Sequence, residues 1–231
     1  MSAIRRVADL TETDITMARD EGNEDIWHKG NEVLYKLCAD YPDHTDDQII
    51  VAKVWLIGRS YAAAVERGRT VEADTQTSED FYRLKVAKAF KDKKLDSLLK
   101  KLKESQPTND SDDAEWIRAG LEIHGQLVKT LNHITGKDKR SFASKYLHFH
   151  VSDAFFIYDS IAAHGLSTFL PRHRLKDELC KPSQVADVDD TYRTSVNKVY
   201  FLREEILQQH SVRLTPRQID RLLLRVGSQN T

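Results

Sequence analysis

Residues 131–160 read LNHITGKDKRSFASKYLHFHVSDAFFIYDS and carry the clearest structural signal in the chain. Apolar residues before Gly136 recur at helical spacing, and the glycine predicts a tight turn that ends this helix. A second, short helix is expected from about Ser141 to His150, and Asp159 follows just beyond a pair of aromatic residues. The stretch therefore predicts two helices joined by a positively charged turn.

Helical spacing of apolar residues recurs through the rest of the chain. Thr45 and Gln48 fit a capping box that opens a helix ending at Gly68, and Thr215 followed by Pro216 is typical of a helix start. No stretch alternates apolar and polar residues as a strand does, and the 9 glycines and 5 prolines leave few turns. Further helices are expected at about residues 23–39, 46–68, 78–104 (as one helix or two), 117–134 and 189–209, and from 158 and 216 onwards. We therefore predict an all-α fold of about eight to ten helices.

The 231 residues are enough to bury a core without covalent staples. Residues 1–22 lack periodicity and are expected to form an N-terminal arm, and residues 23–231 a single helical domain. Its two lobes are expected at about 23–104 and 114–231. The segment SQPTNDSDD, residues 105–113, is rich in turn-forming residues and is the predicted linker.

Several classes of protein are disfavoured by composition. The two cysteines, Cys38 and Cys180, are too few for a disulfide framework or a Cys-rich zinc site, so a reducing compartment is expected. No apolar run approaches the roughly 18 residues that a membrane span needs. The first residues, MSAIRRVADLTETD, have no signal-peptide core. We therefore expect a cytoplasmic protein that has no membrane partner.

The net charge of −1 is a cancellation between segments of opposite sign. Residues 1–48 carry a net charge of −7, whereas residues 83–103 carry +7, and residues 129–145 and 193–225 carry +4 each. Segregated basic charge is typical of a protein that meets a polyanion with one face, although Lys-rich helices are also common as solvated surfaces. The pattern favours nucleic acid as a partner.

The turn before Ser141 has the chemistry of a phosphate site. A helix that begins there points its first N–H groups outward, and the helix dipole adds partial positive charge. Such a site positions a backbone phosphate and reads no base. The residues expected to bind DNA phosphate are Gly136, Lys137, Lys139, Arg140 and Ser141.

A resemblance to a known family is carried by three groups of residues: Ile134-Thr135-Gly136, Ser141-Phe142-Ala143-Ser144 and Ile157-Tyr158-Asp159. Together they resemble the helix-hairpin-helix DNA glycosylase superfamily, most closely its 8-oxoguanine-glycosylase branches. The resemblance covers some 30 of the 231 residues. It implies a helix-hairpin-helix glycosylase-like bundle with two helical lobes around a cleft, acting as a monomer on double-stranded DNA. It also implies that the target base is flipped out of the duplex before excision.

Two departures from the family pattern concern the reaction. Asp138 replaces the second hairpin glycine, so the turn must differ in detail. At the position where lyase-type members carry the amine nucleophile, this chain has Arg140 or Ser141, and neither side chain forms a Schiff base. Lys139 and Lys145 are the nearby candidate amines, but hydrolysis by water, as in a monofunctional enzyme, is the simpler expectation.

Asp159 is the expected catalytic residue. Partly desolvated by its aromatic neighbours, it would stabilise the cationic sugar that forms as the glycosidic bond breaks, and orient the attacking water. An Asp before Ser160 is also a good helix cap, and this structural interpretation stays open.

The candidate residues for the base pocket carry rings or charged donors. Gly58 in mid-helix requires a reason, either a ligand or close packing, which draws attention to the neighbouring Arg59 and Tyr61. His148 and His150 are two residues apart, so they do not face each other as metal ligands would on one helix. We therefore expect no metal, while the resemblance allows a structural monovalent cation at the hairpin carbonyls. The predicted pocket residues are Arg59, Tyr61, His148, His150 and Tyr158.

The leading hypothesis is a DNA N-glycosylase that excises a damaged or modified base and leaves an abasic site. Base-excision repair and defence against phage DNA with hypermodified bases are both possible settings. The alternative is a non-enzymatic helical DNA-binding or interaction protein in which Asp159 only caps a helix. Arg217, Arg221 and Arg225 recur every four residues and could line a phosphate backbone or form a solvated face.

Overall fold

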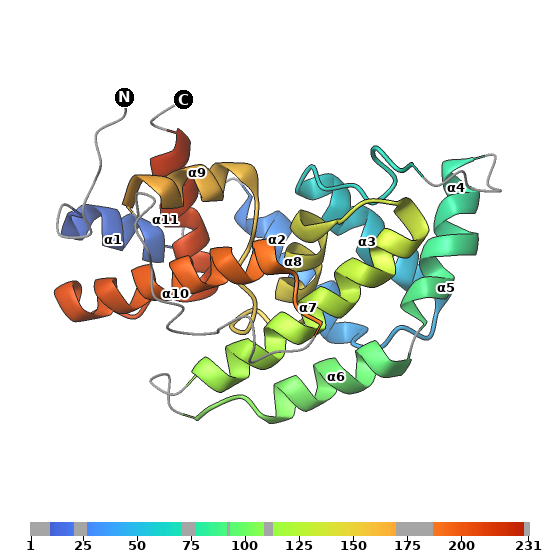
Figure 1. Cartoon of the computed structure of the whole chain (residues 1–231), viewed down its shortest axis with the longest axis horizontal. Helices are drawn as coiled ribbons and strands as arrows, with labels where there is room; N and C mark the ends of the chain where they lie inside the picture. The colour runs from blue at the N-terminus through green and yellow to red at the C-terminus, as the bar shows by residue number, and fades with distance from the viewer. Residues whose placement is uncertain are drawn as a thin grey trace.

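The computed structural model describes residues 10–20, 27–70, 77–91, 93–108, 113–169 and 187–228. Over these residues the chain is all-α, as predicted: it forms 10 helices, counting the continuous segment 78–90 as one, and no strand (Figure 1). Among the same residues, no helix has the combination of length and apolarity that crossing a membrane requires.

The long helices match the expected positions closely. Segment 78–90 contains a π-helical turn, Tyr82–Val86, between α4 and α5. The helices are α1 (Glu12–Arg19), α2 (His28–Asp40), α3 (Asp47–Ser60), α4 (Ser78–Phe81), α5 (Ala87–Phe90), α6 (Lys93–Glu104), α7 (Ala114–Thr135), α8 (Arg140–His150), α9 (Ser160–Phe169), α10 (Asp190–His210) and α11 (Pro216–Ser228). The expected Lys-rich helix is thus divided into two.

The predicted limits of α3 were wrong at both ends. Asp46, and not Thr45, caps the helix, because its Oδ1 accepts hydrogen bonds from two first-turn N–H groups. The helix ends at Ser60 and not at Gly68, because the following loop folds back on Gly58. The N–H of Ala63 donates to the carbonyl of Gly58 at 2.8 Å, and a Cβ at position 58 would lie 3.2 Å from the Cα of Ala64. Close backbone packing explains this glycine.

Part of the expected N-terminal arm is a packed helix. Thr11 and Asp14 form a capping box that opens α1, and Ile15 and Ala18 are buried. This helix packs against α11 at the other end of the chain, and Figure 1 shows the two side by side. Only residues 10–20 of the expected arm are described.

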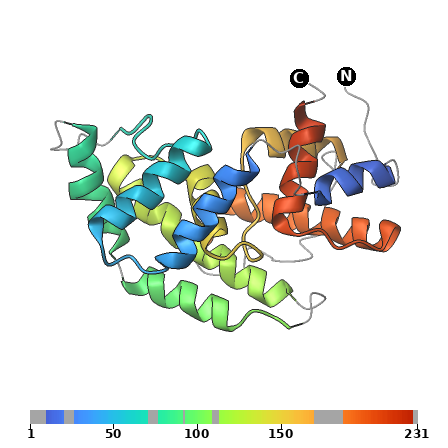
Figure 2. The same ribbon diagram turned by 180° about the vertical axis from the view of Figure 1, so that it is seen from behind.

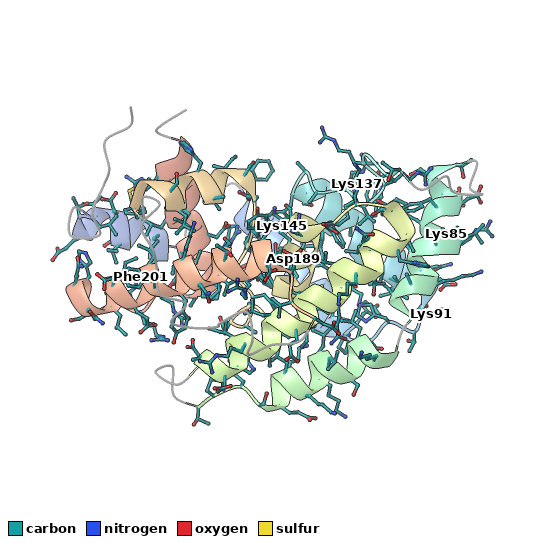
Figure 3. All side chains as sticks on the ribbon, in the orientation of Figure 1. Lys85, Lys91, Lys137, Lys145, Asp189 and Phe201 are labelled. Carbon is teal, nitrogen blue, oxygen red and sulfur yellow. The ribbon has the colours of Figure 1, made fainter. Side chains whose placement is uncertain are left out.

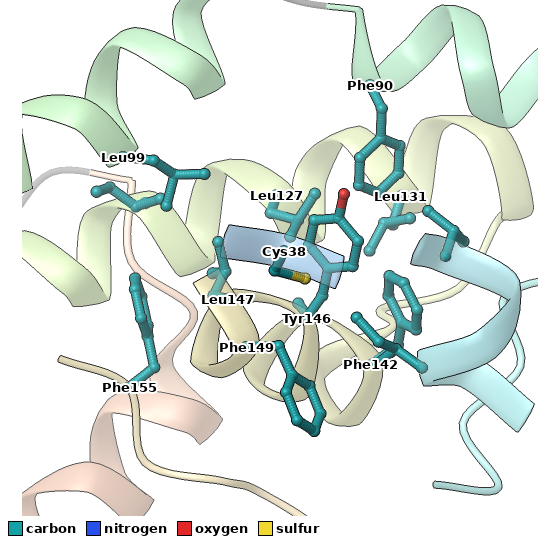
Figure 4. Close-up of a cluster of buried hydrophobic side chains, with 14 of the residues drawn as sticks. Cys38, Phe90, Leu99, Leu127, Leu131, Phe142, Tyr146, Leu147, Phe149 and Phe155 are labelled. Carbon is teal, nitrogen blue, oxygen red and sulfur yellow. The ribbon is translucent and has the colours of Figure 1, made fainter. Parts of the chain in front are cut away.

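Helix α8 lies at the centre of the first of two hydrophobic clusters. It is sandwiched between α7 on one side and α2 and α3 on the other (Figures 1 and 2). Figure 4 shows Phe142, Tyr146 and Phe149 of α8 beside Leu131 of α7 and Cys38 of α2. Burial of every residue from 142 to 150 fixes α8 more firmly than a surface helix.

The second cluster joins α1, α9, α10 and α11 to the first half of α7. Ile117 and Leu121 of α7 belong to it, whereas Leu127 and Leu131 of the same helix belong to the first cluster. Helix α7 therefore contributes residues to both clusters. Lys145 of α8 meets Asp159, which immediately precedes α9.

Gly125 on α7 generates a stability prediction. A Cβ at this position would overlap the carbonyl oxygen of Asp187, which precedes α10. We expect Gly125→Ala to lower the free energy of unfolding by about 1–3 kcal/mol, because the two backbones must separate. Gly30→Ala on α2, where nothing lies within 4 Å of the new Cβ, is the matched control and should be neutral or slightly stabilising. Urea denaturation measures both, and equal stability of the two variants would contradict the packing argument.

Candidate functional site

Helices α7 and α8 are joined by the predicted turn at residues 136–139, which we call the hairpin. Gly136 ends α7 in the left-handed conformation, with φ 66°, and its N–H donates to the carbonyl of Asn132 at 2.7 Å. Asp138 does not have a positive φ. Its carboxylate accepts hydrogen bonds from Asn132 Nδ2 at 2.7 Å and from the Arg140 guanidinium at 2.8 Å. The turn therefore needs no second glycine, because a carboxylate ties its two sides together.

The cationic residues of the hairpin are in different environments. Arg140 does not have the free guanidinium that the sequence predicted, because its Nε donates to both carboxylate oxygens of Asp189, at 2.8 and 2.7 Å. Lys139 is half-buried, and its Nζ donates to the carbonyl of Arg67 at 2.5 Å. Burial lowers the pKa of Lys139. These two residues hold the hairpin in place, and Lys137 is its exposed cation.

The start of α8 retains the features of an anion site. Lys139 occupies the N-cap position and makes no side-chain hydrogen bond to the first turn. The first N–H groups of α8 therefore lack the usual side-chain cap, next to exposed Lys137 and half-buried Gly136. The Ser141 hydroxyl already has a partner, because its Oγ accepts a hydrogen bond from Lys145 Nζ.

Lys145 is a buried amine one turn into α8. Its Nζ donates to Ser141 Oγ at 2.7 Å and to the Tyr158 carbonyl at 3.4 Å, and it lies 3.5 Å from Asp159 Oδ2. Burial lowers the pKa of this amine, while the carboxylates of Asp159 and Asp220 raise it. The fold thus places a desolvated amine against a carboxylate from the neighbouring helix (Figure 3 labels Lys145).

Asp159 uses its two carboxylate oxygens differently. Oδ1 accepts the N–H of Ala162 at 2.8 Å, and the backbone carbonyl accepts the N–H of Ala163 at 2.9 Å, so Asp159 caps α9. Oδ2 faces Lys145, and 23% of the side chain is exposed. The capping interpretation and a chemical role are therefore compatible, with one oxygen for each.

Tyr61 connects the Lys145 amine to a surface cavity. Lys145 Nζ lies 5.8 Å from the centre of the Tyr61 ring, and the Arg217 guanidinium lies 6.0 Å from it. The Tyr61 hydroxyl donates to Asn31 Oδ1 at 2.7 Å. Asn31 and Arg217 both line a cavity of about 340 Å³, whose other lining residues are His28, Glu32, Tyr35, Ser152, Asp153, Thr215 and Arg221. The Tyr61 ring therefore lies near both the amine and two residues that line the cavity.

The two histidines of α8 are not free to contact a ligand. His148 is fully buried, with Nδ1 bonded to the Phe155 carbonyl at 2.9 Å and Nε2 sharing a 2.6 Å hydrogen bond with Tyr35. Since Tyr35 lines the cavity, His148 supports its wall from behind. His150 lies in a separate buried cluster, where its Nε2 is 3.3 Å from Lys53 Nζ. The prediction that these rings touch a base is corrected, because neither has a free ring nitrogen facing the cavity.

Arg59 and Tyr158 also lie elsewhere than predicted. Arg59 is exposed, pairs with Glu66 at 2.5 Å and is not among the cavity-lining residues. Tyr158 lines a different surface hollow, between α9 and α10, and contributes its carbonyl to Lys145. Of the five predicted pocket residues, Tyr61 is the one that the structure brings beside both Lys145 and the cavity wall.

The sequence reasoning missed Asn31, Tyr35 and Asp220, and it grouped Arg217 with a surface stripe. That stripe is divided: Arg217 faces Tyr61, whereas Arg225 points to α1, 3.8 Å from Asp14. The spacing of Arg217 and Asp220 by three residues on α11 was the available signal, since such pairs share a helix face. Among the described residues, no group of three or more His, Cys, Asp or Glu side chains has the arrangement of a metal site.

Buried His148 predicts a pH-dependent stability. Burial lowers its pKa from 6.5 to about 4, so the unfolded chain takes up a proton at a higher pH than the folded protein. The stability due to neutral His148 is complete above pH 6.5 and is lost as pH falls toward 4. Between these values, His148→Gln should reduce the slope of unfolding free energy against pH by about 1.4 kcal/mol per unit. His133→Gln, at an exposed position of α7, is the control. Identical slopes for wild type and His148→Gln, measured by urea denaturation, would show that His148 is not buried in its neutral form.

Comparison with known proteins identifies the N-terminal part of the chain. Residues 13–154 match the model of the HI_0787_N family, described as an N-terminal domain. No curated protein and no solved structure matches the chain. The matched segment contains the hairpin and Lys145 and ends before Asp159. The chain belongs to the HI_0787_N family.

Proposed function

We propose that the protein is a DNA N-glycosylase that extrudes a damaged or modified base and cleaves its bond to the sugar. One observation carries the proposal: Lys145 Nζ lies 3.5 Å from Asp159 Oδ2, and the Tyr61 ring lies near both this amine and Arg217 of a polar cavity. A buried amine with a lowered pKa beside a carboxylate is the arrangement expected of a nucleophile and a group that stabilises positive charge. The helix-hairpin-helix resemblance of residues 134–159 supports the same reaction.

Asp159 and Lys145 have complementary roles in this reaction. As the bond between C1′ and the base nitrogen breaks, its electron pair leaves with the base, and the sugar becomes cationic. The Asp159 carboxylate stabilises that cation. An uncharged Lys145 amine then forms the new bond to C1′ and afterwards loses a proton, whereas a hydrolytic reaction forms the bond to water instead. The 3.5 Å contact favours the amine over the water that the sequence favoured, because the amine already occupies the position beside Asp159.

The cavity lined by Asn31, Tyr35 and Arg217 is the proposed receptor for the extruded base. Its volume of about 340 Å³ lies at the lower end of the range for small-molecule sites. The amide, phenol and guanidinium groups offer hydrogen-bond donors and acceptors for a base edge, and the Tyr61 ring lies near both the cavity residues and the amine. A polar lining of this kind suits a base with additional carbonyl or hydroxyl groups. This polar lining is compatible both with a role in base-excision repair and with defence against phage DNA that carries hypermodified bases.

The hairpin and the basic stretches are the proposed contacts to the DNA backbone. The N–H groups at the start of α8 lie on the same helix as Lys145, less than two turns from it, and exposed Lys137 lies in the turn that precedes this helix. Figure 3 shows Lys85 and Lys91 on segment 78–91 at one end of the molecule and Lys137 at the hairpin. A phosphate held at the hairpin would fix the position of the target sugar relative to the amine.

Base excision by matched variants tests the proposed function. Duplexes carrying single modified bases are incubated with protein and treated with alkali, and cleaved strands are measured on denaturing gels. We expect Lys145→Gln and Asp159→Asn each to reduce the single-turnover rate at least 100-fold, the range found for groups acting at the reacting atoms. Lys36→Gln, which removes an exposed lysine of α2, should retain the wild-type rate.

The controls separate chemistry from folding. Asparagine still caps a helix, so Asp159→Asn should unfold at nearly the wild-type temperature, while Asp159→Ala should lose about 1 kcal/mol of stability. Borohydride trapping identifies the nucleophile: a covalent adduct on Lys145 indicates amine attack, and cleavage without an adduct indicates water. DNA binding without base release from any duplex would support a non-enzymatic binding protein and overturn the proposal.

The proposed phosphate contact at Lys137 predicts a change in salt dependence. Each phosphate contact contributes about one unit to the slope of log affinity against log salt. Lys137→Gln should therefore reduce that slope by about 1 and weaken all duplex sequences equally, because the contact reads no base. Fluorescence anisotropy from 50 to 200 mM salt measures the slope. An unchanged slope would remove Lys137 from the interface.

A further inference from the structure

A buried carboxylate on α11, Asp220, lies behind the proposed site. Only 2% of Asp220 is exposed, and Oδ2 accepts a hydrogen bond from Arg217 at 3.0 Å. Its other oxygen, Oδ1, has no hydrogen-bond partner among the described residues. An ionised carboxylate with a buried, unbonded oxygen is costly to the fold, and such groups are retained most often where they serve a function.

The charged groups that influence the pKa of Asp220 include both members of the proposed reacting pair. Arg217 and Arg221 come from α11 itself, Lys145 comes from α8, and Asp159 comes from the start of α9. Helix α11 packs along α9, which fixes this arrangement. Helix α1 also packs on α11, but its Asp14 is directed to Arg225. Burial lowers the pKa of His148, and the Arg217 guanidinium lowers it further.

We propose that Asp220 is a positioning residue of the glycosylase site: it anchors Arg217 at the cavity wall and, through its negative charge, controls what fraction of the Lys145 amine is uncharged. This inference rests on the proposed function. Asp220 touches neither the base nor the sugar; it acts through Arg217 and Lys145. Its role differs from that of Asp159, whose Oδ2 faces the amine directly.

The charge on Asp220 affects the protonation of Lys145 in a definite direction. Burial raises the pKa of Asp220 to about 7; Arg217 and Lys145 lower it, and Asp159 raises it. Above this pH the ionised carboxylate stabilises the ammonium form of Lys145. Below it the neutral carboxyl withdraws that stabilisation and leaves the amine easier to deprotonate. Ionisation of Asp220 therefore opposes the gain in free amine as the pH rises, and flattens the pH dependence of the reaction.

Asp220→Asn removes the charge and retains an oxygen that can accept from Arg217. We expect the rising limb of the single-turnover pH profile to become steeper, so that the rate at pH 8.5 divided by the rate at pH 6.5 increases about threefold or more. Asp220→Glu keeps the charge and should restore the wild-type profile even if its rate is lower. Glu115→Gln, which removes a carboxylate that is 84% exposed, is the control. A profile of wild-type shape in Asp220→Asn would overturn the inference and leave Asp220 a structural residue.

A direct titration gives a result even without base excision or a folded variant. In wild-type protein, carbon NMR of the aspartate carboxyls and nitrogen NMR of the lysine amines follow Asp220 and Lys145 with pH. We expect Asp220 to titrate near pH 7 and the Lys145 signal to respond over the same interval. Titration of Asp220 near pH 4, or a Lys145 signal that does not respond, would contradict the inference. If coupling is observed but no DNA is cleaved, the proposed function fails while the electrostatic link stands.

Discussion

The buried amine of Lys145 is the constraint on which the candidate site depends. An ammonium group removed from water costs several kcal/mol unless polar partners surround it. The chain supplies these from three places: Ser141 on the same helix, the Tyr158 carbonyl before α9, and the carboxylate of Asp159. Since α8 is enclosed by α2, α3 and α7, the amine cannot escape to solvent by a movement of its helix. The core thereby fixes the amine relative to the hairpin at the start of α8.

The site is divided between two parts of the fold. Lys145 belongs to α8 in the first hydrophobic cluster, whereas Asp159 and Asp220 precede or lie on helices of the second. The match to the HI_0787_N family ends at residue 154, between these two parts. The segment beyond the family domain thus supplies the carboxylates, and packing of α11 along α9 keeps them beside the amine. A substitution that loosens this packing would separate the charges without changing any residue in contact with substrate.

Local signals predicted much of the fold, because helix caps and apolar spacing act over a few residues. The glycine turn at Gly136 and the start of α11 at Pro216 are examples. The early end of α3 at Ser60 depends on the loop that directly follows it and returns to Gly58. Other failures arise from tertiary contacts, since His148 shares a hydrogen bond with Tyr35, 113 residues away. The sequence indicated Lys145 and Asp159 separately, but only the packing of α8 beside the start of α9 reveals their contact. Asn31 had no local signal of a site, since it reaches the site through Tyr61 on another element, whereas the spacing of Asp220 from Arg217 was a local signal of their pairing.

The most direct test of this account is the affinity for two abasic-site analogues in otherwise identical duplexes. One carries a cationic pyrrolidine ring in place of the sugar, and the other a neutral tetrahydrofuran ring. A site built to stabilise a cationic sugar through Asp159 should bind the pyrrolidine duplex at least 100-fold more tightly, as transition-state analogues are bound. That preference should disappear in Asp159→Asn while binding of the tetrahydrofuran duplex is unchanged. Equal affinity of the wild-type protein for the two duplexes would contradict the central claim.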